Sequence, residues 1–327
     1  MFIGETISLF VALAWTATAL FAEVGSKRMG SLPFNFMRMA MSLVLLALTL
    51  WLVMGTPYPR YADGDTWLWL LLSGLVGYVI GDYCLMQGYI HIGSRFGQLF
   101  MTLSAPTAAI AGRLFLGERM SPLAILGMII TLGGIAMSIL SKDNTSKDSK
   151  KVRLKLPAKG IFYAAMAGVG QGAGLVLSKM GLLHYEYATL AAGLSSFDLP
   201  DGALLPIPLC YSIPFAATLI RTYIGLVGFF LVLMLFNKDG LSKLHHAVCD
   251  RKAMWCALGS TVFGPFVGVS ASLLATLYTS AGIAQTLFAL TPILIIAPAA
   301  ILFHQKITVR EVIGAVISVI GVALFFV

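Results

Sequence analysis

Six ionisable residues stand inside or at the ends of long apolar stretches, where a charged side chain is costly to keep. Apolar residues make up 58% of the 327-residue chain and charged residues only 11%, which is the composition of a protein that lies in a lipid bilayer. A charge at membrane depth marks either a functional position or a tight ion pair. The six residues are Glu23, Arg38, Asp82, Arg113, Lys179 and Arg221.

Asp82 is the acidic residue well inside an apolar stretch. It could be a proton-coupling group or the site for a substrate amine, because a carboxylate removed from water can exchange a proton in the physiological pH range. It could equally form a structural ion pair with Arg38, since paired charges are common within membranes. Helical spacing places Tyr78 on the same stripe, and we expect Glu23, Arg38, Asp82 and Arg95 to cluster in one half of the membrane.

Several uncharged side chains are further candidates for a substrate cavity. Gln98 and Gln285 each lie in the first turns of a predicted helix, on a stripe of small residues, and could face one cavity from two directions. The alternative for both is hydrogen bonding between helices. Trp15, Tyr78 and Gln171 are weaker candidates, because each fits a packed interface as well as a cavity.

Ten apolar segments are long enough to cross a bilayer as helices. They are continuously apolar, whereas a membrane-spanning strand would alternate between apolar and polar residues. We therefore predict an all-α integral membrane protein with ten transmembrane helices. The predicted spans are residues 3–24, 33–54, 67–90, 95–116, 120–141, 159–183, 213–236, 253–279, 281–303 and 309–327.

The chain repeats itself at an offset of 187 positions, so that Gly77 meets Gly264, Gly81 meets Gly268, and Gln98 meets Gln285. Each half holds five predicted helices, an odd number, so the second half must enter the membrane upside down. We predict two inverted five-helix repeats at residues 1–141 and 159–327, joined by a basic linker at residues 142–158. Inversion would place Lys179 and Arg221 in the opposite half of the membrane from Asp82.

Lysine and arginine residues gather on one side of the predicted helices, chiefly in the linker. The positive-inside rule predicts a cytoplasmic linker and both termini outside, in a multi-pass protein of the inner (plasma) membrane. The net charge of +8 then reflects orientation, and we expect no nucleic-acid partner. An insertion at residues 185–212 is either a loop packed on the outer face or a lid over the outer mouth.

The motifs of the first half are Pro106 in the fourth predicted helix, the run Gly117-Glu118-Arg119 at the next corner, and Gly127, Gly133 and Gly134 in the fifth. With Trp15 and Arg38, they resemble the drug/metabolite transporter (DMT) superfamily, specifically its EamA branch. The resemblance covers nearly the whole chain outside the linker and the insertion. The second half departs from it at Gln305-Lys306, where the glutamate is absent. We expect Glu118 to be structural, at the start of the fifth helix.

The resemblance implies a secondary transporter that moves a small molecule across the bilayer by alternating access, with export and proton coupling as the expected mode. Arginine and lysine outnumber acids inside the spans, which favours an amino acid or a related anionic or zwitterionic compound. Efflux of cationic, drug-like compounds is the alternative. A non-transporting membrane partner or a lipid-handling subunit is the alternative from another class.

Motifs for catalysis are not found in the sequence. It contains no P-loop, no nucleophile elbow and no metal-ligand spacing, so we expect neither an enzyme nor a bound cofactor or metal. Substrate identity, direction, coupling ion and the choice between monomer and homodimer stay open at this point.

Overall fold

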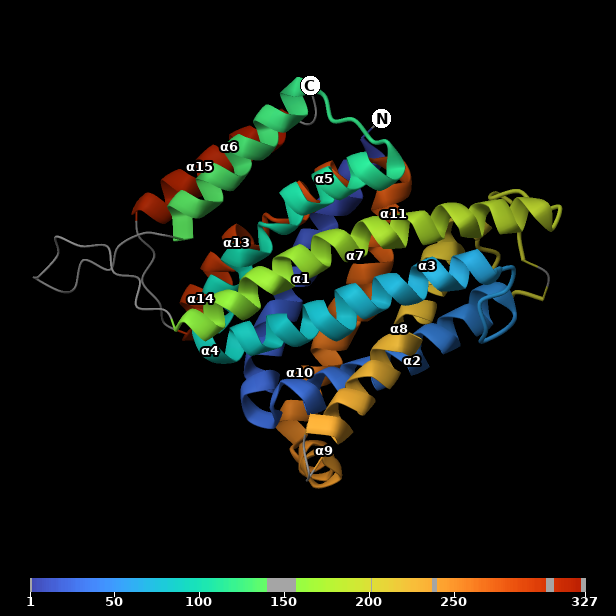
Figure 1. The fold of residues 1–327 in the computed structure, drawn as a ribbon, viewed down its shortest axis with the longest axis horizontal. Helices are drawn as coiled ribbons and strands as arrows, with labels where there is room; N and C mark the ends of the chain where they lie inside the picture. The colour runs from blue at the N-terminus through green and yellow to red at the C-terminus, as the bar shows by residue number, and fades with distance from the viewer. Residues whose placement is uncertain (1, 140–156, 201, 237–239, 304–308, 325–327) are drawn as a thin grey trace, which may run out of the picture.

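The computed structural model describes residues 2–139, 157–200, 202–236, 240–303 and 309–324, and these residues are helical apart from short connections (Figure 1). The basic linker and Gln305-Lys306 fall outside the described residues, as does the Arg95 side chain.

The first half contains α1 (Ile3–Met29), α2 (Ser31–Met54), α3 (Gly64–Gly74), η1 (Leu75–Asp82), α4 (Tyr83–Met101), α5 (Ser104–Leu116) and α6 (Pro122–Ile139). The second contains α7 (Ala158–Ala191), α8 (Leu209–Phe236), α9 (Gly240–Cys249), α10 (Arg251–Thr261), η2 (Val262–Phe266), α11 (Val267–Tyr278), α12 (Ala281–Phe288), α13 (Thr291–Leu294), α14 (Ile296–Phe303) and α15 (Val309–Ala323).

Grouped end to end, these elements form ten passes, in agreement with the all-α, ten-helix prediction. Eight helical runs of the described chain are long and apolar enough to cross a membrane, and two shorter apolar helices lie within α6 and α15. The third pass runs from α3 through η1 into α4, which bends at Gly93 (φ 77°), so the fourth pass begins at Ser94. Glycine suits this bend because it adopts positive φ without steric cost.

The third pass of each half is built in the same irregular way. In the first half it begins at Asp63, whose carboxylate accepts a hydrogen bond from the Thr66 amide (2.8 Å), and in the second at Asp250, whose carboxylate accepts from Ala253 (3.1 Å). Each then widens into a π-helical segment, η1 or η2. The sequence suggested an uninterrupted helix here. π-helical segments are rare and often occur at functional positions, so this irregularity draws attention to the third passes.

The contacts between elements are those of two interlocked, inverted copies. Helix α1 packs against α10, η2 and α11, which form the third pass of the other half, and α7 packs against α3, η1 and α4. Helices α2 and α8 also lie together, and in Figure 1 α7 runs the length of the molecule beside α3 and α4. The centre of the molecule is therefore lined by both halves.

Helices α6 and α15, the fifth passes, pack side by side at the edge of the bundle (Figure 1). Ser318 donates to the carbonyl of Thr131 (3.1 Å) and Thr131 donates to the carbonyl of Ser318 (3.5 Å), although the two residues are 187 positions apart. This reciprocal contact between equivalent residues is what a two-fold relation between the halves produces. It provides structural evidence for the repeat.

The connections define two ends of the bundle. The linker end carries the α1–α2 corner at Gly30, the bend at Gly93 and α9; the far end carries the α2–α3 and α7–α8 connections, seen at the right of Figure 1. Helix α7 continues to Ala191 and α8 starts at Leu209, so the irregular part of the insertion is confined to the described residues 192–200 and 202–208.

The irregular part of the insertion is attached to the far end of α2. The amides of Leu204 and Leu205 both donate to the carbonyl of Leu52, each at 2.9 Å. The Leu209 amide donates to the carbonyl of Asp198 (3.1 Å), which closes the loop on itself. These bonds make the insertion a packed cover over the end of α2.

Candidate functional site

A small cavity of about 50 Å³ lies between the two halves. This volume holds only a few water molecules, so the structure presents the central site in a nearly closed form. Its wall contains six of the residues that the sequence singled out, together with a stretch of the second half around η2. The six are Trp15, Arg38, Tyr78, Asp82, Gln98 and Gln171, and the second half adds Gly264, Pro265 and Val269.

Arg38 and Asp82 form a buried ion pair at one side of the cavity, with Nη1 of Arg38 3.2 Å from Oδ2 of Asp82. The same Nη1 also donates to Oδ1 of Asn35 (2.9 Å), and the Asn35 amide donates to the main-chain carbonyl of Asp82 (3.3 Å). Arg38 is 3% exposed and Asp82 6%, so water contributes little to either charge. An ion pair in such surroundings needs these additional hydrogen bonds to be maintained.

Gln171 joins the ion pair to the opposite half of the molecule. Its Nε2 donates to Oδ1 of Asp82 (2.7 Å) and to the main-chain carbonyl of Gly77 (3.0 Å). The Gly77 carbonyl is accessible because it belongs to η1, whose wide turn leaves main-chain groups without regular partners. Asp82 thus accepts hydrogen bonds from α2 and α7, one helix from each half.

Aromatic side chains form the other walls of the cavity. The rings of Trp15 and Phe288 lie 4.9 Å apart, and Gln98 donates through Nε2 to the hydroxyl of Tyr89. Tyr78 separates the cavity from Arg221, whose guanidinium lies over the tyrosine ring with 4.7 Å between Cζ and the ring centroid. Arg221 is 3% exposed.

Besides Arg221, two of the expected candidates lie away from this cavity. Gln285 is not among the described residues that line it: its Oε1 accepts from Ser104 (3.1 Å) and its Nε2 donates to the carbonyl of Gln171 (3.4 Å). The pair Gln98 and Gln285 therefore does not face one space. Glu23 does not join the ion pair, because its carboxylate is held by Lys27 (2.6 Å) and by the amide and hydroxyl of Ser94.

The contacts of Glu23 have a counterpart at the far end of the bundle. There Glu118 pairs with Lys179 (2.5 Å) and accepts from the amide of Ala281 (3.0 Å), as Glu23 pairs with Lys27 and accepts from the amide of Ser94. In both cases a carboxylate caps the start of a fourth pass, where the helix dipole favours negative charge. Glu118 therefore acts at the start of α12, and the expectation that it stabilises the start of the fifth helix is wrong.

The remaining intramembrane candidate, Arg113, has an exposed side chain near the end of α5. Arg113 is not among the described residues that line the cavity. Among the described residues, no group of three His, Cys, Asp or Glu side chains is arranged to hold a metal ion.

Comparison with known families agrees with this architecture. The EamA-like transporter family matches residues 2–140 and 202–327, which together make up most of the chain. This chain belongs to the EamA-like transporter family. It is a multi-pass membrane transporter of the DMT kind, as the motifs around Glu118 suggested. The family is one of transporters rather than of enzymes, and it implies a small-molecule substrate and a bilayer environment.

A solved structure titled "Crystal structure of protein" is similar to this transporter, with a TM-score of 0.64. It is 13% identical in sequence, and the match covers 98% of this chain and 95% of that one. At this identity the likeness supports the fold alone. No curated protein matches the transporter.

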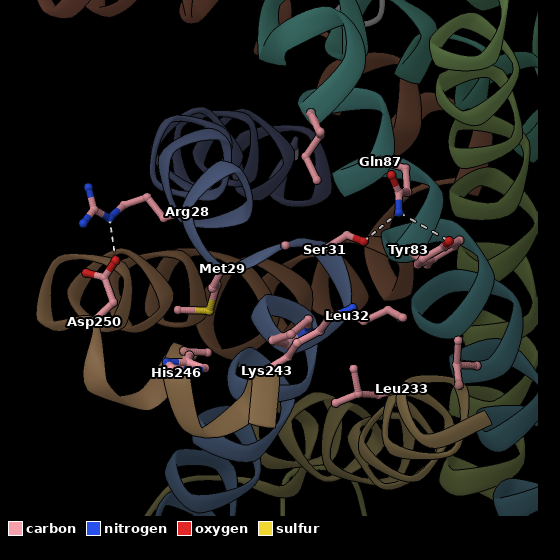
Figure 2. Close-up of a pocket in the computed structure, with 15 residues that line it drawn as sticks. Arg28, Met29, Ser31, Leu32, Tyr83, Gln87, Leu233, Lys243, His246 and Asp250 are labelled. Atoms are coloured by element: carbon pink, nitrogen blue, oxygen red, sulfur yellow. Dashed lines mark hydrogen bonds and ion pairs between the residues drawn. The ribbon is translucent and has the colours of Figure 1, made fainter. Parts of the chain in front are cut away.

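A second, larger cavity of about 750 Å³ opens at the linker end of the transporter, between the α1–α2 corner, α4, α8 and α9. Figure 2 shows Gln87 reaching towards Ser31 and Tyr83, to which its Nε2 donates at 2.9 and 3.3 Å. Ser31 lies one turn before Asn35 on α2, and Gln87 lies just over one turn beyond Asp82. The Gln87–Ser31 bridge therefore lies in the wall of this vestibule, about one helical turn from Asn35 and Asp82.

Sequence reasoning did not select Asn35 or Gln87. Both are polar amides inside apolar helices, and Asn35 precedes Arg38 by three positions, a spacing that places the two side chains on one face. That spacing was a usable signal for Asn35. The role of Gln87 depends on where α2 meets α4, which spacing within one helix does not reveal.

Proposed function

We propose that this transporter is a secondary carrier in the inner membrane that exports an amino acid or a related anionic or zwitterionic metabolite by alternating access. Asp82 is the proton-coupling group and Arg38 is its partner. The single observation that carries this proposal is the buried Arg38–Asp82 pair, which contacts both halves through Gln171. A proton or a substrate that changes this pair would act on the interface between the halves.

The chemistry follows from the two charge states of Asp82. While ionised, it holds Arg38 and Gln171, and the halves are tied together at the cavity. Protonation, or capture of Arg38 by an acidic group of the substrate, removes part of this attraction. The free energy of the interface then differs between the loaded and empty carrier, which is what coupling requires.

The other readings have less support. Efflux of cations calls for a carboxylate that is free to receive them, whereas Asp82 is already neutralised by Arg38. A non-transporting or lipid-handling role would not need a buried ion pair in the first repeat that is hydrogen-bonded to the second through Gln171.

The test is uptake by proteoliposomes under an imposed pH gradient, comparing the wild type with Asp82→Asn. We expect Asp82→Asn to lose acceleration by the gradient while it still exchanges substrate between the two sides. Asp65→Asn, at an exposed carboxylate in the first turn of α3, is the matched control and should behave as wild type.

A complication is that Asp82→Asn leaves Arg38 without its partner. The double variant Arg38→Gln with Asp82→Asn restores the charge balance and keeps the test usable if the single variant does not fold. Uptake by either variant that still follows the pH gradient in full would exclude Asp82 as the coupling group.

A further inference from the structure

The charges buried at the centre of the molecule do not balance. Arg38 and Arg221 are both 3% exposed, and Asp82 is the one carboxylate that forms an ion pair with either of them among the described residues. Asp82 forms its ion pair with Arg38, so Arg221 has no carboxylate of its own among the described residues. A buried guanidinium without a counter-charge is unfavourable, so a protein that keeps one has a use for it.

The two arginines occupy equivalent places in the two halves. A methyl group built on Gly264 would lie 3.0 Å from Nη2 of Arg38, and one built on Gly77 would lie 3.0 Å from Nη2 of Arg221. Gly77 and Gly264 are themselves partners in the 187-residue repeat. Each arginine therefore crosses the third pass of the opposite half at the same point.

The position equivalent to Asp82 does not carry a carboxylate in the second half. The repeat pairs Asp82 with Val269, which lines the central cavity and packs against the cluster around Tyr78. The first half thus has an arginine with its carboxylate, and the second half has the arginine alone.

Unpaired hydrogen-bond donors gather at the same place. Nε of Arg221, the hydroxyl of Tyr78 and Nε of Arg38 are all buried and have no hydrogen-bond partner among the described residues. The Arg221 guanidinium lies on the Tyr78 ring, so two of these donors belong to neighbouring side chains. Buried donors are normally satisfied, and a cluster of unsatisfied ones indicates a place for an acceptor that arrives from outside.

We propose that the acidic group of the transported molecule takes the place of the missing carboxylate and binds Arg221 and the Tyr78 hydroxyl next to Val269. This inference rests on the proposed carrier function and specifies its substrate as a compound with a carboxylate or a phosphate. Because the cavity of about 50 Å³ is too small for a metabolite, binding is accompanied by movement of Tyr78 and opening of the cavity.

The experiment introduces the missing group. Val269→Asp places a carboxylate where the substrate's own would bind, and Val269→Asn is its neutral control of similar size. Purified variants are tested by thermal shift against amino acids, monocarboxylates, dicarboxylates and organic phosphates, each paired with its amide or ester. A ligand that binds the folded form must raise the midpoint of unfolding.

We expect only the acidic member of a pair to stabilise the wild type. Val269→Asp should weaken binding of that acidic ligand by about tenfold or more, because the new carboxylate would compete with it for charge-assisted hydrogen bonds, which are among the strongest. Val269→Asn should bind the acidic ligand about as tightly as wild type does. Arg221→Gln should abolish binding and raise the unfolding midpoint of the empty protein, because it removes an uncompensated charge. A residue kept only for structure would not show this opposition. Arg221→Gln also serves if Val269→Asp does not fold.

The outcomes separate this inference from the carrier proposal. Neutral members that bind as well as acidic ones, or acidic ligands that bind Arg221→Gln as tightly as wild type, would overturn the inference and leave the carrier intact. If proteoliposomes take up no member of the panel and none stabilises the protein, both fail.

Discussion

Thr131 and Ser318 stand at the same position of the two repeats, and each donates a hydrogen bond to the main-chain carbonyl of the other. The interface between α6 and α15 is therefore nearly self-complementary, and glycines bring the two helices together. A methyl group on Gly134 would overlap the Ser318 hydroxyl and lie 2.7 Å from the Gly314 carbonyl oxygen; one on Gly321 would lie 2.6 Å from the Thr131 amide nitrogen.

Gly134→Ala should destabilise the protein by about 1–3 kcal/mol, because the added methyl forces α6 and α15 apart. The neighbouring Gly133 is a matched control, since a methyl group there would have no other atom within 4 Å. The measurement is the thermal midpoint in detergent. Equal losses in Gly134→Ala and Gly133→Ala would mean that helix contact is not the cause.

Arg38→Ala should destabilise the transporter by about 3–5 kcal/mol, because it leaves Asp82 charged and unpaired in a buried place. The double variant Arg38→Met with Asp82→Leu should lose less than the single one, since no charge is stranded. Arg28→Ala, which breaks an ion pair on the surface, is the control and should move the thermal midpoint little. A double variant that is less stable than the single one would contradict this account.

Glu118→Gln should loosen the start of α12, because it weakens the contacts to Lys179 and to the Ala281 amide. Hydrogen bonds to charged groups contribute about 1.5–3 kcal/mol, so a cysteine placed at Ser280 should react with a thiol reagent about tenfold faster or more. Glu23→Gln, which alters the related contact at the linker end, should leave that rate unchanged. A similar acceleration in both variants would indicate general loosening.

Asp250 links stability to pH at the linker end. Its hydrogen bond from Arg28, together with the amide of Ala253, holds the pKa of the Asp250 carboxyl below its ordinary value. A lowered pKa in the folded state means that the stabilisation is complete above the unfolded pKa of about 3.9 and is lost as the pH falls through the folded value. The thermal midpoint of Asp250→Ala should therefore decline less steeply with acid than that of wild type below about pH 4.

The predicted orientation can be tested with two single cysteines in a background without the native ones. Met29→Cys lines the vestibule at the linker end, and Ala192→Cys is exposed at the far end. A membrane-impermeant thiol reagent should label the first from the cytoplasmic side alone and the second from outside alone. Labelling of Met29→Cys from outside and of Ala192→Cys from the cytoplasmic side would show that the orientation is the opposite of the predicted one.

Much of the architecture could be predicted from the sequence, because membrane helices occur as long apolar runs. The repeat could be found because glycines of the two halves match at an offset of 187 positions. The charges inside those runs drew attention to Arg38 and Asp82, since so few polar residues occur at that depth. Six expected cavity residues do line one cavity for the same reason. These inferences depend on composition and spacing within single helices.

The remaining details depend on contacts between helices, which spacing does not encode. Glu23 was grouped with Asp82 because both lie at a similar depth, but depth does not fix the direction of a side chain. The Glu23 carboxylate instead accepts hydrogen bonds from the amide and hydroxyl of Ser94. Gln98 and Gln285 are equivalent in the repeat, yet only Gln98 faces the cavity. The π-helical turn of η1 packs against α7 and α8, and the sequence of residues 75–82 alone does not predict it.

The hydrogen bonds from the Leu204 and Leu205 amides to the Leu52 carbonyl favour one conformation of the empty carrier, although the two halves are nearly symmetric. These bonds join the connection between α7 and α8 to the end of α2, whereas the short Gly30 corner makes no main-chain bond to another helix within the described part of the chain. We therefore expect the empty carrier to open more readily at the linker end, where the larger cavity already lies and which the predicted orientation assigns to the cytoplasm. This preference sets which pool of substrate is sampled first, while the gradients across the membrane still decide the net direction of flow.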